Sequence, residues 1–468
     1  MEYVKKNIFM ITGYLQIFII YAIIVALPGS LYAQSKAVLR NQARDQYKPY
    51  HYFENPQVCA GCHWDKFERW DLSQHAKGFT GDFFQKQFYD LVLASESFAP
   101  ELKGVKDGCI GCHSPSAFLA GEMVPPRAIP YDNYMNKREG YRTRADRGIF
   151  CDFCHTISHF RNDPPFNHDY VSTVTEAVDT KFGDLEFPWS PHHETATSEI
   201  FEDPVMCATC HNEKNPYNVW VKATFTEYEE SVYPFRGVAC QTCHMQPMGG
   251  KPAKMGILRP HNTDHWFGGG FTGFVEGAAT VNIKLPDNGL NPGSKVDFRI
   301  DVQAVATGHK FPTGSSEERD VWLRVSLVDG LGRELLHIPV PENPDNPYDK
   351  YFITSNEKNG YPSHSKLSEP IERDALPEGD RLYHSIFLDS EGEVTYAQWL
   401  CVKEIENRLG PLEVRTENYS FTVPQNLPDE VYLQAMLNYR RMPDSLADFF
   451  GIERRPVIQV AKDVRRIK

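Results

Sequence analysis

Five copies of the pentapeptide Cys-x-x-Cys-His lie between residues 59 and 244 of this 468-residue chain. Thiols at positions i and i+3 lie on one face of a helical turn. An imidazole follows each second thiol directly. This pattern is typical of covalent c-type haem attachment, in which the thiols add to the two vinyl groups and the histidine binds the iron. The predicted attachment residues are Cys59, Cys62, His63, Cys109, Cys112, His113, Cys151, Cys154, His155, Cys207, Cys210, His211, Cys240, Cys243 and His244.

Chance and other uses of cysteine do not explain these motifs. With 11 Cys and 17 His in the chain, random placement would yield on the order of 0.01 such pentapeptides. Structural zinc sites and redox disulfides also use Cys-x-x-Cys, but neither requires a histidine after every second cysteine. The sequence therefore predicts five covalently attached haems, each with an iron. Cys401 is left over, and we expect it to be a small buried apolar residue.

The N-terminal segment has the features of an export signal. Lys5 and Lys6 precede an apolar run from Ile8 to Leu27, and Leu31-Tyr-Ala33 ends the segment with a small residue. This order predicts a signal peptide over residues 1–33, cleaved after Ala33. An uncleaved membrane anchor is the alternative, because the apolar run is nearly long enough to span a bilayer. Both interpretations place the rest of the chain in the periplasm or at the cell surface.

The charge of the chain bears on its partners. The formal net charge is −13, and haem propionates would add to it. Because nucleic acid binds through Lys and Arg, this balance excludes it as a partner. We expect redox partner proteins with basic patches, and contact with a membrane only if the N-terminal segment stays as an anchor.

The composition changes near residue 275, which predicts an α+β chain of two domains. Residues 34–274 hold all five motifs and would form short helices and loops around stacked haems, because too few residues surround each haem to bury it separately. Apolar residues at helical spacing predict helices at about 64–74 and 82–95, and loops are expected at 123–134 and 162–167.

Residues 275–468 show the period-two alternation of half-buried strands. The clearest runs are at 296–304, 321–327 and 431–437, and weaker ones are at 280–285, 382–388 and 419–423. Turn signals such as Asp329-Gly-Leu-Gly332 separate them. The pattern predicts a C-terminal β-sandwich with a long insertion at about 338–380.

The second axial ligands must come from the twelve histidines outside the motifs. These are His51, His75, His159, His168, His192, His193, His261, His265, His309, His337, His364 and His384. The stretch from Cys59 to His75, with Trp70, Ser73 and Ala76, resembles the motif-plus-helix unit of multihaem cytochromes of the c-552/c-554 type, the family of the tetrahaem electron acceptor of hydroxylamine oxidoreductase. That resemblance implies that His75 is a distal ligand.

Three further stretches resemble ligand patterns of bacterial multihaem cytochromes. Ser190-Pro-His-His193-Glu-Thr implies His193, and the segment from Arg259 to Gly269 implies His265. Thr307-Gly-His309-Lys-Phe-Pro-Thr-Gly314 resembles a segment by which a β-domain inserts a histidine into the haem region, and this implies His309. For the fifth haem the sequence leaves His159, His168 or no ligand open.

These observations favour a non-catalytic electron carrier in a respiratory chain, with mostly bis-histidine haems. One alternative is an oxidoreductase acting on a small nitrogen or sulfur species at a five-coordinate haem. The chain lacks the Cys-x-x-Cys-Lys motif of pentahaem nitrite reductase, and its last part reads as strands where that enzyme is helical. Tyr141, Arg142, Arg144 and Arg147 could serve catalysis, but we favour pairing of the arginines with propionates. A second alternative is a subunit of an extracellular cytochrome filament.

Overall fold

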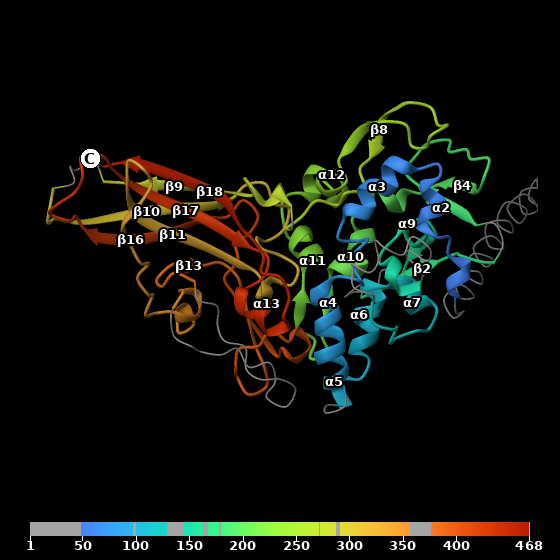
Figure 1. Cartoon of the computed structure of the whole chain (residues 1–468), viewed down its shortest axis with the longest axis horizontal. Coiled ribbons are helices and arrows are strands. Elements are labelled where there is room, and N and C mark those ends of the chain that lie inside the picture. Colours follow the sequence, from blue (N-terminus) through green and yellow to red (C-terminus); the bar gives the residue numbers. More distant parts are fainter. Residues whose placement is uncertain are drawn as a thin grey trace, which may run out of the picture.

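The computed structural model describes residues 48–96, 100–128, 144–161, 167–176, 179–270, 272–286, 291–355 and 376–467. The predicted signal peptide, Tyr141, Arg142 and His364 lie outside these residues. Short helices and many strands give an α+β chain, as predicted. Figure 1 shows an elongated molecule with the helices gathered on one side and long strands on the other.

Short helices position all five motifs in the N-terminal part. They are α2 (Pro56–Ala60), α3 (Trp64–Leu72), α4 (Asp82–Lys86), α5 (Leu93–Ser95), α6 (Val105–His113), α7 (Pro115–Leu119), α9 (Cys151–Cys154), α10 (Val205–His211), α11 (Thr224–Glu229) and α12 (Cys240–His244). Two-stranded ladders lie between them, formed by β1 (Ile157–Phe160), β2 (Tyr170–Ser172), β3 (Thr180–Gly183), β4 (Glu194–Thr197), β5 (Glu213–Lys214), β6 (Trp220–Lys222), β7 (Pro247–Gly250) and β8 (Arg259–Thr263).

Both helices expected from the sequence are present. The first is α3, which ends at Leu72, two residues before the predicted end. The second runs from Asp82 to Ser95 as α4 and α5, joined by a π-helical segment at Gln87–Val92. Such π segments occur as single turns within α-helices. Residues 123–128 of the first predicted loop contain neither helix nor strand, and the rest of that loop lies outside the described residues.

Long strands form the C-terminal part. They are β9 (Ala279–Lys284), β10 (Lys295–Ala304), β11 (Asp320–Asp329), β12 (Glu334–His337), β13 (Arg381–Leu382), β14 (Ser385–Leu388), β15 (Lys403–Glu406), β16 (Val414–Thr422), β17 (Val431–Arg440) and β18 (Val457–Arg466), with α13 (Asp444–Phe450) before the last strand. One antiparallel sheet has the order β16-β10-β9. A second has the order β12-β11-β17-β18, and β13 pairs with β11.

One apolar core lies between these two sheets. In β10 every second residue is buried, from Val296 to Ala304, and the residues between them are exposed or half-buried. The buried face of β10 shares a single cluster with Leu323 of β11 and Leu433 of β17. The alternation seen in the sequence therefore puts one face of each sheet on this core.

The predicted strand at 382–388 is divided between two sheets. Leu382 pairs with Trp322 of β11, whereas Ser385 pairs with Glu406 of β15. The chain passes from one partner to the other at Tyr383 and His384. A single alternating run was therefore the wrong prediction for this segment, because alternation does not reveal which strand each half pairs with.

The two parts of the chain share a second apolar cluster. Phe88 and Ile110 of the motif region lie in it together with Ile386 of β14 and Trp399. The Trp399 indole Nε1 donates a hydrogen bond of 2.9 Å to the Ser95 hydroxyl. Cys401 is fully buried, as expected. Within the described residues, no helix combines the length and apolar character that crossing a membrane requires.

Leu323 provides a test of the core. Leu323→Ala should lower the free energy of unfolding by about 3 kcal/mol, because it removes buried methyl groups and leaves a cavity. Urea denaturation followed by far-UV circular dichroism would measure the shift. The matched control is Leu331→Ala, whose side chain is exposed in the turn between β11 and β12. Equal effects of the two substitutions would contradict the position of Leu323 in the core.

Candidate haem centres

Each Cys-x-x-Cys-His motif lies on or at the end of a short helix. The motif cysteines fall within or directly after α2, α6, α9, α10 and α12, which places the two thiols of each motif one helical turn apart. All ten motif cysteines are free, and each is at least partly exposed, unlike Cys401. Paired thiols that remain accessible are what haem attachment requires.

The motifs adjoin one another in space. The side chains of Cys59 and Cys151 are hydrogen-bonded to each other. So are those of Cys112 and Cys210, and those of Cys207 and Cys240. The first motif therefore lies beside the third, and the fourth lies beside both the second and the fifth.

The third motif also lies beside the fourth, and this contact joins the first and third motifs to the other three. A hydrogen bond to Cys112, burial and the nearby Cys154 thiol all raise the pKa of the Cys210 thiol. Cys154 belongs to the third motif, and Cys210 to the fourth. All five attachment sites thus form one connected group, in which the fourth motif adjoins the second, third and fifth.

Four motif histidines face a second histidine. The ring centres of His63 and His193 are 6.4 Å apart. Those of three further pairs are each 6.2 Å apart: His211 with His75, His155 with His265, and His244 with His309.

This separation fits two imidazoles on opposite sides of one metal ion. A ring nitrogen about 2 Å from the metal, with the ring centre about 1.1 Å beyond it, puts two ring centres roughly 6.3 Å apart. Rings in direct stacking contact would be closer than this. The residues present therefore fit bis-histidine ligation of an iron at four motifs.

Backbone carbonyls set the tautomer of four motif histidines. The Nδ1 atom of His63 lies 2.8 Å from the Pro252 carbonyl oxygen, and the Nδ1 of His155 lies 2.6 Å from that of Phe182. His113 and His244 make the same contact with the carbonyls of Gly78 and Gly268. Because a carbonyl only accepts, Nδ1 must carry the proton, which leaves Nε2 free for a metal.

Three of the four opposing histidines are oriented in the same way. The Nδ1 atoms of His193, His265 and His309 lie within 3.0 Å of the carbonyl oxygens of Glu194, Thr263 and Lys310. Burial lowers the pKa of His75 to about 3 and that of His265 to about 3. These two imidazoles therefore stay neutral, which is the form that ligates a metal.

The second motif differs from the other four. The His113 ring stacks on Phe84, with ring centres 4.0 Å apart. Among the described residues, no second histidine ring faces His113. His159 lies on β1, where its Nδ1 contacts the Ser158 hydroxyl at 2.8 Å. His168 packs against Phe118 with ring centres 4.6 Å apart, so neither candidate from the sequence is brought to a motif imidazole.

Arg147 contacts backbone near the first motif. Its Nη1 donates a hydrogen bond of 2.9 Å to the Phe53 carbonyl oxygen, and its side chain is buried. This contact holds the segment that precedes α2.

Two loops carry exposed apolar side chains, and one of these loops adjoins the first motif. Phe187 and Met255 are each 91% exposed. Trp189, Ile257 and Leu258 are also strongly exposed in the same two loops. The Lys254 amide donates to the Cys62 carbonyl, which places one of these loops beside the motif. An apolar wall of this kind suits a haem macrocycle, whose burial would remove it from water.

Two classes of functional group were not found from the sequence. The carbonyl groups that orient the histidines left no signal, because every residue has a carbonyl. Glu227 and Arg408 were also missed. They form a buried ion pair of 2.6 Å beside the His309 loop, and they come from distant parts of the chain.

A family model matches part of the motif region. Residues 58–156 match the model of the family described as cytochrome c554 and c-prime. No curated protein matches the chain.

One solved structure shares the fold over most of the chain. It is a penta-heme cytochrome c552 from Thermochromatium tepidum, matched with a TM-score of 0.57 at 18% sequence identity, over 90% of this chain and 100% of that one. The sporulation control protein Spo0M from Bacillus subtilis is matched over 41% of this chain and 49% of that one at 14% identity. Its TM-score of 0.16 is too low to support an argument.

The family match and the shared fold support a multihaem c-type cytochrome of the c552/c554 type. They support electron transfer by covalently bound c-type haem as its function. Multihaem c-type cytochromes are typically exported proteins.

Proposed function

We propose that this multihaem cytochrome of the c552/c554 type carries electrons on five covalently bound c-type haems in a periplasmic or cell-surface respiratory chain. Four of the haems would be bis-histidine ligated. The haem irons would supply the one-electron chemistry. The chain's own residues bind the haems, orient the axial ligands and keep the attachment sites adjacent.

The observation that carries this proposal is the set of four histidine pairs with ring centres 6.2–6.4 Å apart. Each pair joins a motif histidine to a histidine from elsewhere in the chain. A metal with both axial positions filled has no place for a substrate, which favours electron transfer over catalysis at these four sites. His75, His193, His265 and His309 would be the distal ligands.

The C-terminal part would provide one ligand and a surface for a partner. His309 comes from the loop between β10 and β11. The two sheets that share one core support a β-sandwich as the architecture of this part. With a net charge of −13, the chain would dock basic surfaces of its electron donor and acceptor rather than nucleic acid. Residues 1–33 would direct export and then be cleaved after Ala33, whereas a retained segment would anchor the chain to the membrane.

Mass and spin state test the proposal together. The intact mass of the purified protein should show five covalent haems. Electron paramagnetic resonance of the oxidised protein should show at least four low-spin haems, because two imidazoles give a strong ligand field. Fewer than four low-spin signals in a five-haem protein would contradict the ligand assignment.

A second candidate function follows from His113, which no histidine ring faces in the described part of the chain. The haem bound at Cys109 and Cys112 would then be five-coordinate and able to bind a small nitrogen or sulfur species. A partly exposed ion pair, Lys222 with Glu213, lies near these cysteines and could move a proton.

Ligand binding separates the two candidates. If the haem at His113 is open, the oxidised protein should show one high-spin signal that changes when nitrite or hydroxylamine is added. Turnover of either compound with a reductant would favour the oxidoreductase, and five low-spin signals would exclude it. Light scattering tests the cytochrome filament as a third arrangement, because a stable monomer would contradict it.

A further inference from the structure

We infer that Glu227 is a positioning residue for the fifth haem centre, because its buried carboxylate fixes the loop that presents His309 to His244. The inference rests on the proposed function, in which these two histidines ligate one iron. It assigns a role to a residue that contacts neither the haem nor the iron. Glu227 would make ligation at this haem depend on docking of the C-terminal part.

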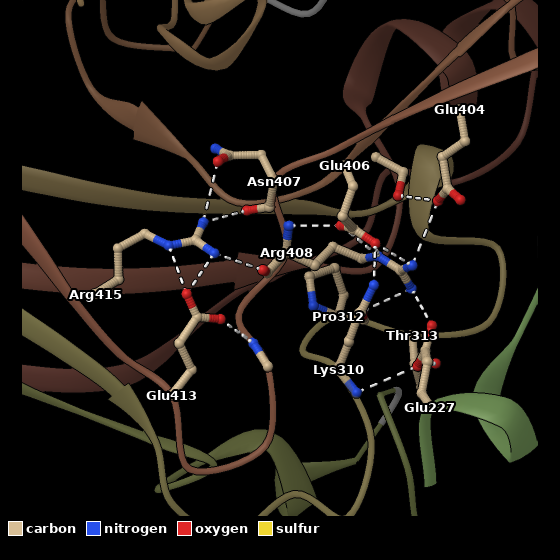
Figure 2. Close-up of polar contacts among 12 residues, drawn as sticks. Glu227, Lys310, Pro312, Thr313, Glu404, Glu406, Asn407, Arg408, Glu413 and Arg415 are labelled. Carbon is tan, nitrogen blue, oxygen red and sulfur yellow. Dashed lines mark hydrogen bonds and ion pairs between the residues drawn. The ribbon is translucent and has the colours of Figure 1, made fainter. Parts of the chain in front are cut away.

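The Glu227 carboxylate receives hydrogen bonds from both sides of the loop's Phe311-Pro312 step. Its Oε2 accepts from the Lys310 amide at 3.2 Å and from the Thr313 hydroxyl at 2.6 Å. Glu227 is only 4% exposed, so these hydrogen bonds are not replaced by water. Figure 2 shows the carboxylate reaching the loop from α11.

The contact with Lys310 acts directly on the orientation of His309. The His309 Nδ1 donates a hydrogen bond of 2.8 Å to the Lys310 carbonyl. Glu227 holds the amide of that same residue. Two hydrogen bonds in series therefore connect the carboxylate to the imidazole that faces His244, with ring centres 6.2 Å apart. Partners of this kind, one step behind a ligand, orient ligands in metal sites.

Arg408 fixes the other oxygen of the carboxylate. Its Nη1 lies 2.6 Å from Glu227 Oε1, and its Nη2 lies 2.6 Å from Glu406 Oε2 and 3.3 Å from Glu404 Oε1. The Arg408 side chain is 4% exposed. Glu227 is the most buried of the three carboxylates that compensate the Arg408 charge, and removing one charge from a buried ionic network is unfavourable. The pair therefore holds α11 against the segment that follows β15.

A second ion pair ties the loop to the same segment. The Lys310 ammonium lies 2.7 Å from Glu406 Oε2, so Glu406 contacts both Lys310 and Arg408. The loop, α11 and the end of β15 thus form one connected polar cluster (Figure 2). In this cluster Glu227 is the group contributed by the motif region.

Glu227→Gln tests the inference. The substitution keeps the shape of the side chain but replaces one acceptor oxygen with a donor and removes one of the three carboxylate charges around Arg408. We expect the oxidised five-haem protein to gain a high-spin signal from one haem. Added imidazole should reverse that signal by occupying the vacated axial position, and the reduction potential of that haem should shift.

The matched control is Glu413→Gln. Glu413 pairs with Arg415 at 2.8 Å in the same region of Figure 2, and its hydrogen bonds are to Arg415 and the Gly410 amide. This variant should keep the spectrum and potentials of the unmodified protein. A high-spin signal of equal size in both variants would overturn the assignment to Glu227.

His309→Ala separates this inference from the proposed function. If His309→Ala leaves every haem low-spin, the ligand assignment itself fails. If His309→Ala produces a high-spin haem and Glu227→Gln does not, only the inference fails. Should Glu227→Gln not accumulate with five haems, Thr313→Val removes one hydrogen bond to the carboxylate together with the contact to the Thr224 hydroxyl, and it should give a smaller high-spin fraction. An unchanged spectrum for Thr313→Val would then overturn the inference.

Discussion

Replacing Cys207 and Cys210 with serine should break the haem array into separate groups. The fourth motif adjoins the second through Cys112, the third through Cys154 and the fifth through Cys240. Without thioether bonds at this motif, the intact mass should fall by one haem. The second and fifth sites would then lose the redox neighbour that they share with the third. Reduction of the protein by dithionite, followed by stopped-flow absorbance, should change from one main phase to several.

The fifth motif provides the matched comparison. Cys240→Ser with Cys243→Ser also removes one haem, but among the described motif cysteines Cys240 adjoins only Cys207 of the fourth motif. The remaining four sites stay adjacent, so reduction should remain close to a single phase. Similar kinetics in the two double variants would contradict the central position of the fourth motif. Their equal haem count excludes an explanation from the number of redox centres.

The sequence predicted which histidines would be distal ligands, but it did not predict which motif histidine each of them faces. Local patterns around His75 and His193 indicated a ligand at each position. The structure brings His75 to His211 of the fourth motif, although His75 follows the first motif closely in sequence. His193 in turn faces His63. A local sequence pattern indicates that a histidine is a ligand. Which motif histidine it faces depends on how helices distant in sequence pack together.

In the C-terminal part, alternation of apolar and polar residues predicted the strands that have one buried face. β10 and β17 were predicted for this reason. β18 was missed, because it lies at the edge of its sheet and Val460 is its one fully buried residue. An edge strand with little burial leaves no period-two signal in its sequence.

The polar cluster around Arg408 could not be derived from sequence. Glu227 and Arg408 are 181 positions apart, and single charged residues on helices and strands are usually solvated. Their burial results from the contact between the two parts of the chain. Groups that depend on such contacts become visible only once the fold is known.

His309→Ala should convert one haem of five from low spin to high spin. The substitution removes the nitrogen that faces His244, and the other axial ligand stays in place. Loss of a nitrogen donor destabilises the ferric state, so the potential of this haem should rise. Axial ligands span about 0.8 V across haem proteins, and a shift on the order of 0.1 V is expected here. Spectroelectrochemistry of the purified protein would measure it.

The result can be assigned to ligation because the surrounding contacts remain. Glu227 and Arg408 keep their ion pair in His309→Ala, so the C-terminal part should stay docked. The matched control is His337→Ala, which removes an imidazole that contacts Asp380 at 2.8 Å on the edge strand β12. That variant should keep all potentials. A protein whose haems all stay low-spin without His309 would take its ligand from another residue, and the C-terminal part would then have no axial role.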